Sequence, residues 1–242
     1  MIFLHILLAL LSLVLLFVIL WFAFYITCSL LVDTKKEYTE NNKFYREALN
    51  FATLTGMVVL RIKLKVTGKE KLDKNQNYYF VSNHRSNLDP ILSWYVFKEH
   101  NVSFMSKPEN FKVPIFGRII HRCCFLPIAK DDIFQAMETV NKAAKIMEKG
   151  EISFGVYPEG KRHTEAEMAP FHNGVFRAAQ KANKPIAVVA VKNADDINRN
   201  YPFNSTTIYI DVLEIIPVEE IKGVKTNIIG DRVRAILEEG LK

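Results

Sequence analysis

Cysteine is scarce in this sequence, and the common nucleic-acid-binding motifs are missing. The three cysteines are Cys28, Cys123 and Cys124. An odd number without a C-x-x-C spacing argues against a disulfide framework and predicts reduced thiols. No zinc-finger, glycine-rich or RNP-type motif accompanies the net charge of +6, so no nucleic-acid partner is expected. The basic excess instead suits an anionic membrane face or a phosphate-bearing substrate.

Charge is absent from the first part of the chain. Residues 1–32 contain no Lys, Arg, Asp or Glu, and about 20 apolar residues suffice to cross the ~30 Å hydrocarbon core of a bilayer. The run lacks the basic start and the small-residue cleavage site of a secretory signal peptide. Basic residues follow it, beginning at Lys35 and Lys36. The positive-inside rule therefore predicts an inner-membrane anchor with the rest of the chain on the cytoplasmic side; the alternative is a helix buried in a soluble fold.

A second apolar stretch has helical periodicity. Apolar and small residues recur at three- and four-residue steps through residues 44–60, which predicts a helix. This helix is expected to lie in the membrane interface, to return against the first helix, or to pack on the domain core. We assign residues 1–60 to membrane-anchoring helices and residues 61–242 to one α/β domain, because that length suits a single core.

The remaining chain alternates between the two periodicities. Strands are predicted at residues 61–66, 77–82, 102–105, 125–129, 152–156, 185–191 and 206–213. Helices are predicted at residues 89–97, 131–149 and 174–182, with a helix pair within 219–239. Asp131 is the expected cap of the second of these helices, and Gly223 and Gly230 are the expected breaks in the pair. The alternation predicts an α/β fold with a largely parallel sheet flanked by helices.

A histidine and an aspartate follow one predicted strand at a functional spacing. Residues 83–90 read NHRSNLDP, and ligands collect at the carboxyl ends of strands in α/β sheets. Asp89 can accept a hydrogen bond from one nitrogen of the His84 imidazole, which frees the other nitrogen as a general base. A substrate hydroxyl can then be the nucleophile; Ser86 is the alternative, although it lies outside any G-x-S-x-G motif. The alternative is a turn histidine beside an aspartate that caps the helix opened by Pro90.

Basic residues follow two other predicted strands. Residues 155–163 read GVYPEGKRH, in which Lys161 and Arg162 can bind a phosphate. Glu159 would orient Arg162 or bind a substrate hydroxyl. Lys107 follows the strand at 102–105 and can reach the same site. The alternatives are a solvated charged loop and a surface lysine.

These segments together resemble the glycerolipid acyltransferase family, and among its members the bacterial 1-acylglycerol-3-phosphate acyltransferases most closely. The resemblance rests on N-H-x4-D after a strand, K-P-x5-P-x2-G at 107–117, Y-P-E-G-x-R at 157–162 and F-H-N-G at 171–174. It extends over residues 62–191. It implies transfer of a fatty acyl group from acyl-CoA or acyl-carrier protein to the sn-2 hydroxyl of lysophosphatidic acid. The product would be phosphatidic acid for phospholipid biosynthesis, formed without a metal or other cofactor.

The resemblance also implies roles for individual residues. His84 would be the general base and Asp89 its support, with Asn83 as the leading residue of that motif. The residues matched to acceptor binding are Lys107, Glu159, Gly160 and Arg162, of which Lys107 and Arg162 would contact the phosphate. Two positions depart from the family pattern: Lys130 stands where an arginine is frequent, and Lys161 where a small hydroxyl residue is common. Backbone N–H groups of residues 83–89 are candidate donors to the oxyanion.

Other functions are compatible with the same residues. The acceptor could be glycerol 3-phosphate or another lysophospholipid. A metal-dependent phosphoesterase could use His84, Asp89 and further histidines, although H-x4-D is not a tight zinc spacing. A third alternative is a membrane protein that binds lipid without catalysing a reaction.

Overall fold

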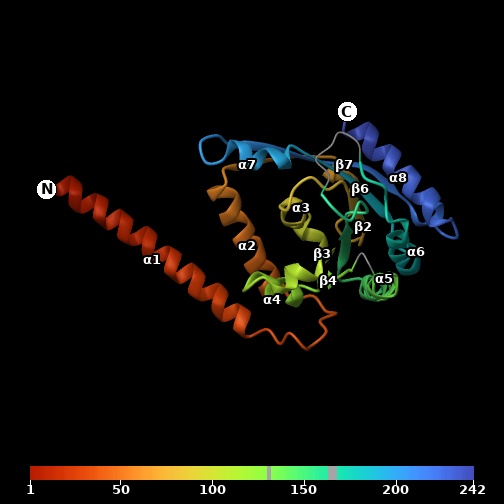
Figure 1. Ribbon diagram of the computed structural model, residues 1–242, viewed down its shortest axis with the longest axis horizontal. Coiled ribbons are helices and arrows are strands. Elements are labelled where there is room, and N and C mark those ends of the chain that lie inside the picture. The colour runs from red at the N-terminus through yellow and green to blue at the C-terminus, as the bar shows by residue number, and fades with distance from the viewer. Residues whose placement is uncertain (130–131, 163–167) are drawn as a thin grey trace.

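The computed structural model describes residues 1–129, 132–162 and 168–242, and it contains one mixed sheet between two layers of helices (Figure 1). The strands are β1 (Ile62–Thr67), β2 (Tyr79–Ser82), β3 (Val102–Ser106), β4 (Leu126–Pro127), β5 (Ser153–Val156), β6 (Ile186–Lys192) and β7 (Thr206–Ile216). The helices are α1 (Ile2–Leu30), α2 (Lys43–Val59), α3 (Asp89–Val96), α4 (Phe116–Arg122), α5 (Ile133–Glu148), α6 (Arg177–Ala182), α7 (Ile197–Asn200) and α8 (Thr226–Gly240). Short 3-10 segments include η3 (Pro108–Lys112) and η4 (Asn173–Phe176).

The sheet is parallel except at one pairing. Its strand order is β1-β7-β6-β2-β5-β3-β4, and β6 pairs with β7 antiparallel while the other neighbours are parallel. The prediction of an α/β fold with a largely parallel sheet is therefore confirmed. Parallel neighbours end at the same edge, so β2, β5 and β3 present their carboxyl ends side by side.

Helices cover both faces of the sheet (Figure 1). Alternate side chains of a strand point to opposite faces, so in β2 Phe80 joins the core under α2, α3 and α4 while Tyr79 and Val81 join the core under α5, α6 and α8. The central strands are buried on both sides, which explains the continuous apolar sequence of β6. The two helical layers thus define separate sides of the molecule.

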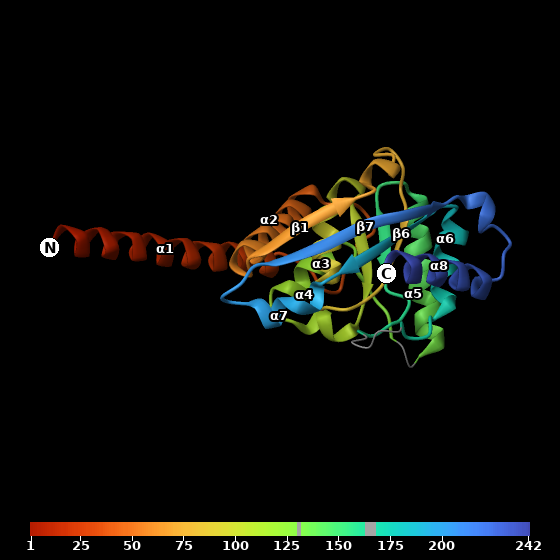
Figure 2. The ribbon, with the colours of Figure 1, turned by 90° about the horizontal axis from the view of Figure 1, so that it is seen from above.

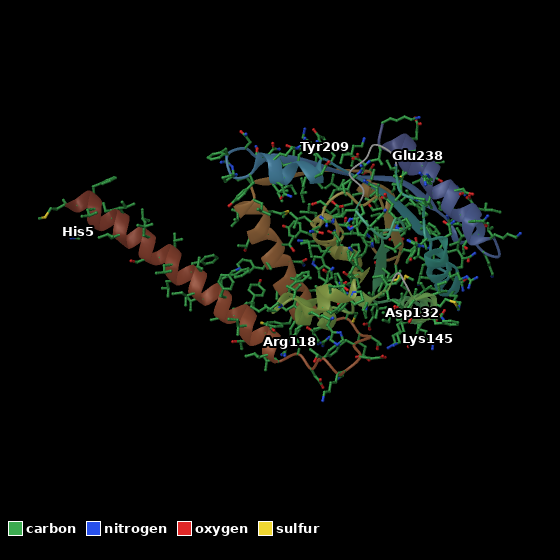
Figure 3. The ribbon with its side chains drawn as sticks, in the orientation of Figure 1. His5, Arg118, Asp132, Lys145, Tyr209 and Glu238 are labelled. Carbon is green, nitrogen blue, oxygen red and sulfur yellow. The ribbon has the colours of Figure 1, made fainter. Side chains whose placement is uncertain are left out.

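Helix α1 projects away from the sheet (Figures 1 and 2). It has 29 residues and a mean hydropathy of 3.1 over its best window, with none of that window buried, so it is long and apolar enough to cross a membrane. Its C-terminal part, from Trp21 onward, packs on the protein. Tyr25 donates to the carbonyl of Ala48, and Arg118, labelled in Figure 3, donates to the carbonyl of Ser29.

Helix α2 packs on the domain through one face and exposes the other. Arg46 is buried, and its guanidinium donates to the Val102 carbonyl and to Ser103 Oγ at 3.0 Å each, while lying 4.7 Å from the centre of the Trp94 ring. The exposed face carries Phe44, Phe51, Leu54, Val58 and Val59. Packing on the domain is therefore observed, whereas contact with a membrane and the boundary at residue 60 remain predictions.

The structure differs from the prediction at a helix break, at a short helix and at a helix cap. Helix α8 runs through Gly230 without a break, because a Cβ there would lie 2.0 Å from Asn173 Oδ1 and the glycine serves close packing. Helix α4 was not predicted, since its seven residues are too short for a periodic signal. Asp132 rather than Asp131 caps α5 by accepting from the Gln135 N–H; Asp131 lies outside the described residues.

The cysteines are free thiols buried in the protein. Burial raises the pKa of Cys123 to about 12 and that of Cys124 to about 11. Since the thiolate is the reactive form, these vicinal residues act as packing groups.

The first prediction concerns the attachment of α2. Arg46→Ala should lower the free energy of unfolding by about 3 kcal/mol, because it leaves a buried carbonyl and hydroxyl without their charged donor. Urea unfolding in detergent measures the change. Arg199→Ala removes an exposed arginine and should change stability by no more than about 0.5 kcal/mol. Equal effects of the two substitutions would contradict the assigned role of Arg46.

Candidate active site

Three loops at the carboxyl edge of the sheet surround one cavity. The loops follow β2, β5 and β3, and the cavity has a volume of about 420 Å³. Its lining includes His84 from the first loop, Arg162 from the second and Lys107 from the third. The structure therefore brings together the candidate base and both candidate phosphate ligands.

The His84 imidazole is held by a buried carboxylate. His84 Nδ1 lies 2.9 Å from Asp89 Oδ2, and the same oxygen accepts the N–H groups of Arg85 and Ser86 at 2.7 Å each. Asp89 is 0% exposed, while the His84 side chain is partly exposed in the cavity. An ionised carboxylate is an acceptor only, so Nδ1 carries the proton and Nε2 remains free to act as a base.

The alternative role of Asp89 as a helix cap is not observed. Helix α3 has Leu88 at its N-cap position and no side-chain hydrogen bond there, although Pro90 opens the helix as expected. The Asp89 carboxylate instead folds back onto the loop that precedes the helix. The aspartate thus fixes the shape of the loop and the direction of the imidazole together.

Tyr157 stacks on His84. The centroids of the two rings lie 4.5 Å apart, with an angle of 30° between the ring planes, and the centroid of the Phe104 ring lies 5.8 Å from that of Tyr157. Burial, with the Asp89 charge nearby, raises the pKa of Tyr157 well above its usual value, so the phenol stays neutral. Tyr157 had no predicted role; the signal that marks it is an aromatic residue directly after a strand and before Pro158.

Asn83 connects the first loop to the neighbouring strand. Its side chain donates to the Val191 carbonyl at 2.9 Å and accepts the Val191 N–H at 2.8 Å, and it is fully buried. The amide therefore extends the β2–β6 pairing by side-chain hydrogen bonds. Asn83 holds the residue before His84 in place and does not line the cavity among the described residues.

Glu159 has a different role from the expected substrate contact. Its two carboxylate oxygens accept the N–H of His84 at 2.9 Å and the N–H of Ala169 at 3.0 Å, and the residue is 2% exposed. It is absent from the described lining of the cavity and ties two loops together. Gly160 follows at φ 63°, a left-handed conformation that favours glycine.

The basic residues fall into three groups. Arg162 and Lys107 line the cavity, and Arg162 is exposed there. Lys161 is exposed and is not part of the described lining. Lys130 lies outside the described residues.

The backbone of the 84–89 loop is already engaged. Its amides donate to the Glu159 and Asp89 carboxylates and to the side chain and carbonyl of Ser86. The engaged donors are those of His84, Arg85, Ser86, Leu88 and Asp89. These five groups shape the loop and are not available to an oxyanion. Of residues 83–89, the N–H groups of Asn83 and Asn87 remain the candidate donors, and Asn87 lines the cavity.

Within residues 1–129, 132–162 and 168–242, no group of three or more His, Cys, Asp or Glu side chains is arranged to hold a metal ion. Catalytic zinc is held by three protein ligands. A zinc-dependent phosphoesterase therefore finds no ligand set in this part of the chain.

Comparison with known proteins identifies the family. A family model named Acyltransferase matches residues 63–192, which is more than half of the chain. The chain belongs to the acyltransferase family. The family resemblance found in the motifs is thereby confirmed.

Curated members of the acyltransferase family align over most of this chain. The 1-acyl-sn-glycerol-3-phosphate acyltransferase of Borreliella burgdorferi is 28% identical over 183 residues, covering 73% of this chain and 72% of that protein. The enzyme of the same name from Salmonella typhimurium is 24% identical over 197 residues, covering 80% of each. The crystal structure of the 1-acyl-sn-glycerophosphate acyltransferase PlsC from Thermotoga maritima superimposes with a TM-score of 0.70 at 18% identity. That match covers 91% of this chain and 87% of the other, and it shows the same fold.

The second prediction tests Glu159 in this acyltransferase. Glu159→Gln keeps the shape but turns one acceptor into a donor that faces a backbone N–H. Loss of this hydrogen bond should lower the free energy of unfolding by about 1–3 kcal/mol. It should also reduce kcat, because the loop that carries His84 becomes less firmly held. The KM for the acceptor should stay unchanged. A raised acceptor KM with normal kcat and melting temperature would instead place Glu159 in contact with substrate; exposed Glu148→Gln is the control.

Proposed function

We propose that the protein transfers a fatty acyl group from an acyl thioester to the sn-2 hydroxyl of 1-acylglycerol 3-phosphate, giving phosphatidic acid for phospholipid biosynthesis. The observation that carries this proposal is the His84–Asp89 pair in a cavity that also contains Arg162 and Lys107. The names of the aligned relatives support the same reaction. The acyl donor is acyl-CoA or acyl-carrier protein, and the reaction uses no further cofactor.

The chemistry follows from the position of the imidazole. The acceptor hydroxyl attacks the thioester carbonyl while His84 Nε2 takes its proton, and Asp89 stabilises the resulting imidazolium through Nδ1–H. The tetrahedral intermediate collapses as the carbon–sulfur bond breaks. The thiolate leaves and takes the proton from the imidazolium. Oxygen replaces sulfur on the acyl carbon, and the base returns to its starting state.

Arg162 and Lys107 bind the acceptor phosphate. A guanidinium offers paired donors to phosphate oxygens and an ammonium supplies a second charge. Both residues line the cavity that contains His84, so a phosphate held by them keeps its glycerol backbone near the base. Binding then converts an encounter of two substrates into an oriented reaction.

The protein is a membrane enzyme anchored by α1 in the inner membrane, with the sheet on the cytoplasmic side. The apolar length of α1 and the exposed apolar face of α2 support this location. The basic residues that follow α1, including Lys35 and Lys36, support the orientation. A lipid acceptor would then reach the cavity from the bilayer surface.

A direct assay tests the function. The purified full-length protein is incubated in detergent with 1-acylglycerol 3-phosphate and radiolabelled acyl-CoA or acyl-carrier protein, and the lipid products are separated. Phosphatidic acid labelled at sn-2 is the expected product. Labelled product from glycerol 3-phosphate or another lysophospholipid alone would overturn the assigned acceptor.

The third prediction concerns the base. His84→Ala should lower kcat by about 10²–10⁴-fold, the range of positioned proton transfer. The melting temperature and recovery in the membrane fraction should stay close to those of the unsubstituted protein. His121→Ala is the control, because that side chain binds the Lys36 carbonyl outside the cavity. Turnover retained in the His84 variant would refute the assignment.

The fourth prediction concerns the phosphate contact. Arg162→Ala should raise the KM for 1-acylglycerol 3-phosphate by about tenfold or more, the effect of losing one charge-assisted contact. The KM for the acyl donor should change little. Lys161→Ala removes the adjacent exposed cation and serves as the control. An unchanged acceptor KM in the Arg162 variant would count against its role.

A further inference from the structure

The cavity extends beyond the residues used above. From the His84 loop it runs between α5 and α6, on the face of the sheet opposite α2, α3 and α4 (Figure 1). The α5 wall carries Ile133, Met137 and Asn141, one turn apart on one side of the helix. The α6 wall carries Arg177 and Lys181, also one turn apart. Two parallel rows of side chains thus face each other across this extension.

The two ends of the extension differ in chemistry. Met137 and Val140 line the middle with apolar surface, and Lys181 Nζ donates to Asn141 Oδ1 at 2.6 Å across the far end. The start of α5 lies at the catalytic edge, because Gln135 Nε2 donates to the Pro127 carbonyl at the end of β4. At about 1.5 Å per residue, the distance along α5 from Ile133 to Asn141 is about 12 Å. In Figure 3, Asp132 and Lys145 mark this helix.

The charges in the cavity are of one sign. Its described lining contains Lys107, Arg162, Arg177 and Lys181 but no Asp or Glu. None of these four cations forms an ion pair with another described residue. One phosphate of the acceptor accounts for the first two cations. The other two lie further along the cavity, and the acceptor phosphate does not account for them.

We propose that Arg177 and Lys181 bind the phosphate of the acyl donor's phosphopantetheine arm, which lies along the groove between α5 and α6. This inference rests on the acyl transfer proposed above. Acyl-CoA and acyl-carrier protein both present the acyl group as a thioester at the end of this arm. The arm places a long uncharged linker with two amides between the thioester and the phosphate. The groove offers a similar order: the base, then apolar surface with Arg177 at the start of α6, then Lys181 and Asn141 at the far end.

The position of the groove suits a donor that arrives from water. It lies under α5 and α6, whereas α1 and α2 belong to the opposite side of the sheet (Figures 1 and 2). A lipid acceptor held near α1 and α2 and a water-soluble donor held by α5 and α6 would meet at His84 from different directions. The acceptor phosphate would then bind Arg162 and Lys107. The donor phosphate would bind Arg177 and Lys181.

The test compares donors with and without the phosphate. Arg177→Glu and Lys181→Glu, singly and together, are assayed in the full-length protein with acyl-CoA, acyl-carrier protein and the acyl thioester of N-acetylcysteamine, which has no phosphate. We expect kcat/KM to fall about tenfold or more with the phosphopantetheine donors. It should stay unchanged with the N-acetylcysteamine thioester, which also shows that the variants are folded. The KM for 1-acylglycerol 3-phosphate should not change.

The experiment includes a control substitution and defined outcomes that would contradict the proposal. Lys74→Glu makes the same charge change at an exposed position before β2, at the opposite edge of the sheet, and should leave both donors unaffected. If the unsubstituted protein accepts only one of the two phosphopantetheine donors, a loss with that donor supports the inference and identifies the source. A loss with only one of two accepted donors would overturn the inference, because both carry the same phosphate. The inference would be overturned by equal losses of kcat/KM with all donors, by a raised KM for 1-acylglycerol 3-phosphate, or by an unchanged kcat/KM with every donor. If the unsubstituted protein transfers no acyl group from any donor, the proposed function itself fails.

Discussion

The site depends on the buried carboxylate of Asp89, whose Oδ2 accepts three hydrogen bonds from its own loop, while Oδ1 has no hydrogen-bond partner among the described residues. A charged group removed from water is costly unless hydrogen bonds replace its solvation. Asp89 meets this cost with one imidazole and two backbone N–H groups on a single oxygen. The same three contacts set the curvature of the loop and the direction of His84. A substitution of Asp89 would therefore alter the conformation of the loop and the orientation of His84 together.

A second buried carboxylate extends the same constraint to another loop. Glu159 accepts the His84 N–H and the Ala169 N–H, so the loop after β5 is attached to the loop after β2. Asn83 attaches the latter to β6 through Val191. The base is thus fixed from both neighbouring strands. Tyr157 then limits rotation of the ring by stacking on it.

Local sequence patterns predicted much of this arrangement, and contacts between elements that are distant in the sequence determine the rest. The aromatic and β-branched residues of β2 and the apolar run of β6 predicted strands. A largely parallel sheet made a shared edge for the loops after these strands expectable, whereas the order of β2, β5 and β3 was not predicted. The partner of Glu159 was not predictable, because every residue carries a backbone N–H and no side-chain pattern marks which one a carboxylate will meet. Gly230 was misread as a helix break, since its reason is the contact with Asn173 on another element.

The placement of the cations has a consequence for selectivity. A cavity lined by four described cations and no described carboxylate carries charge that the protein itself does not neutralise. Phosphate-bearing substrates supply the missing negative charge, whereas a neutral alcohol or a neutral lipid leaves the cations unpaired and gains less from binding. Under the proposed roles, Arg162 and Lys107 hold one phosphate, and Arg177 and Lys181 hold another further along the cavity. Selection for two anionic substrates is what these roles imply, and the apolar residues between the cations would contact the part of the donor that joins its phosphate to the reacting atom.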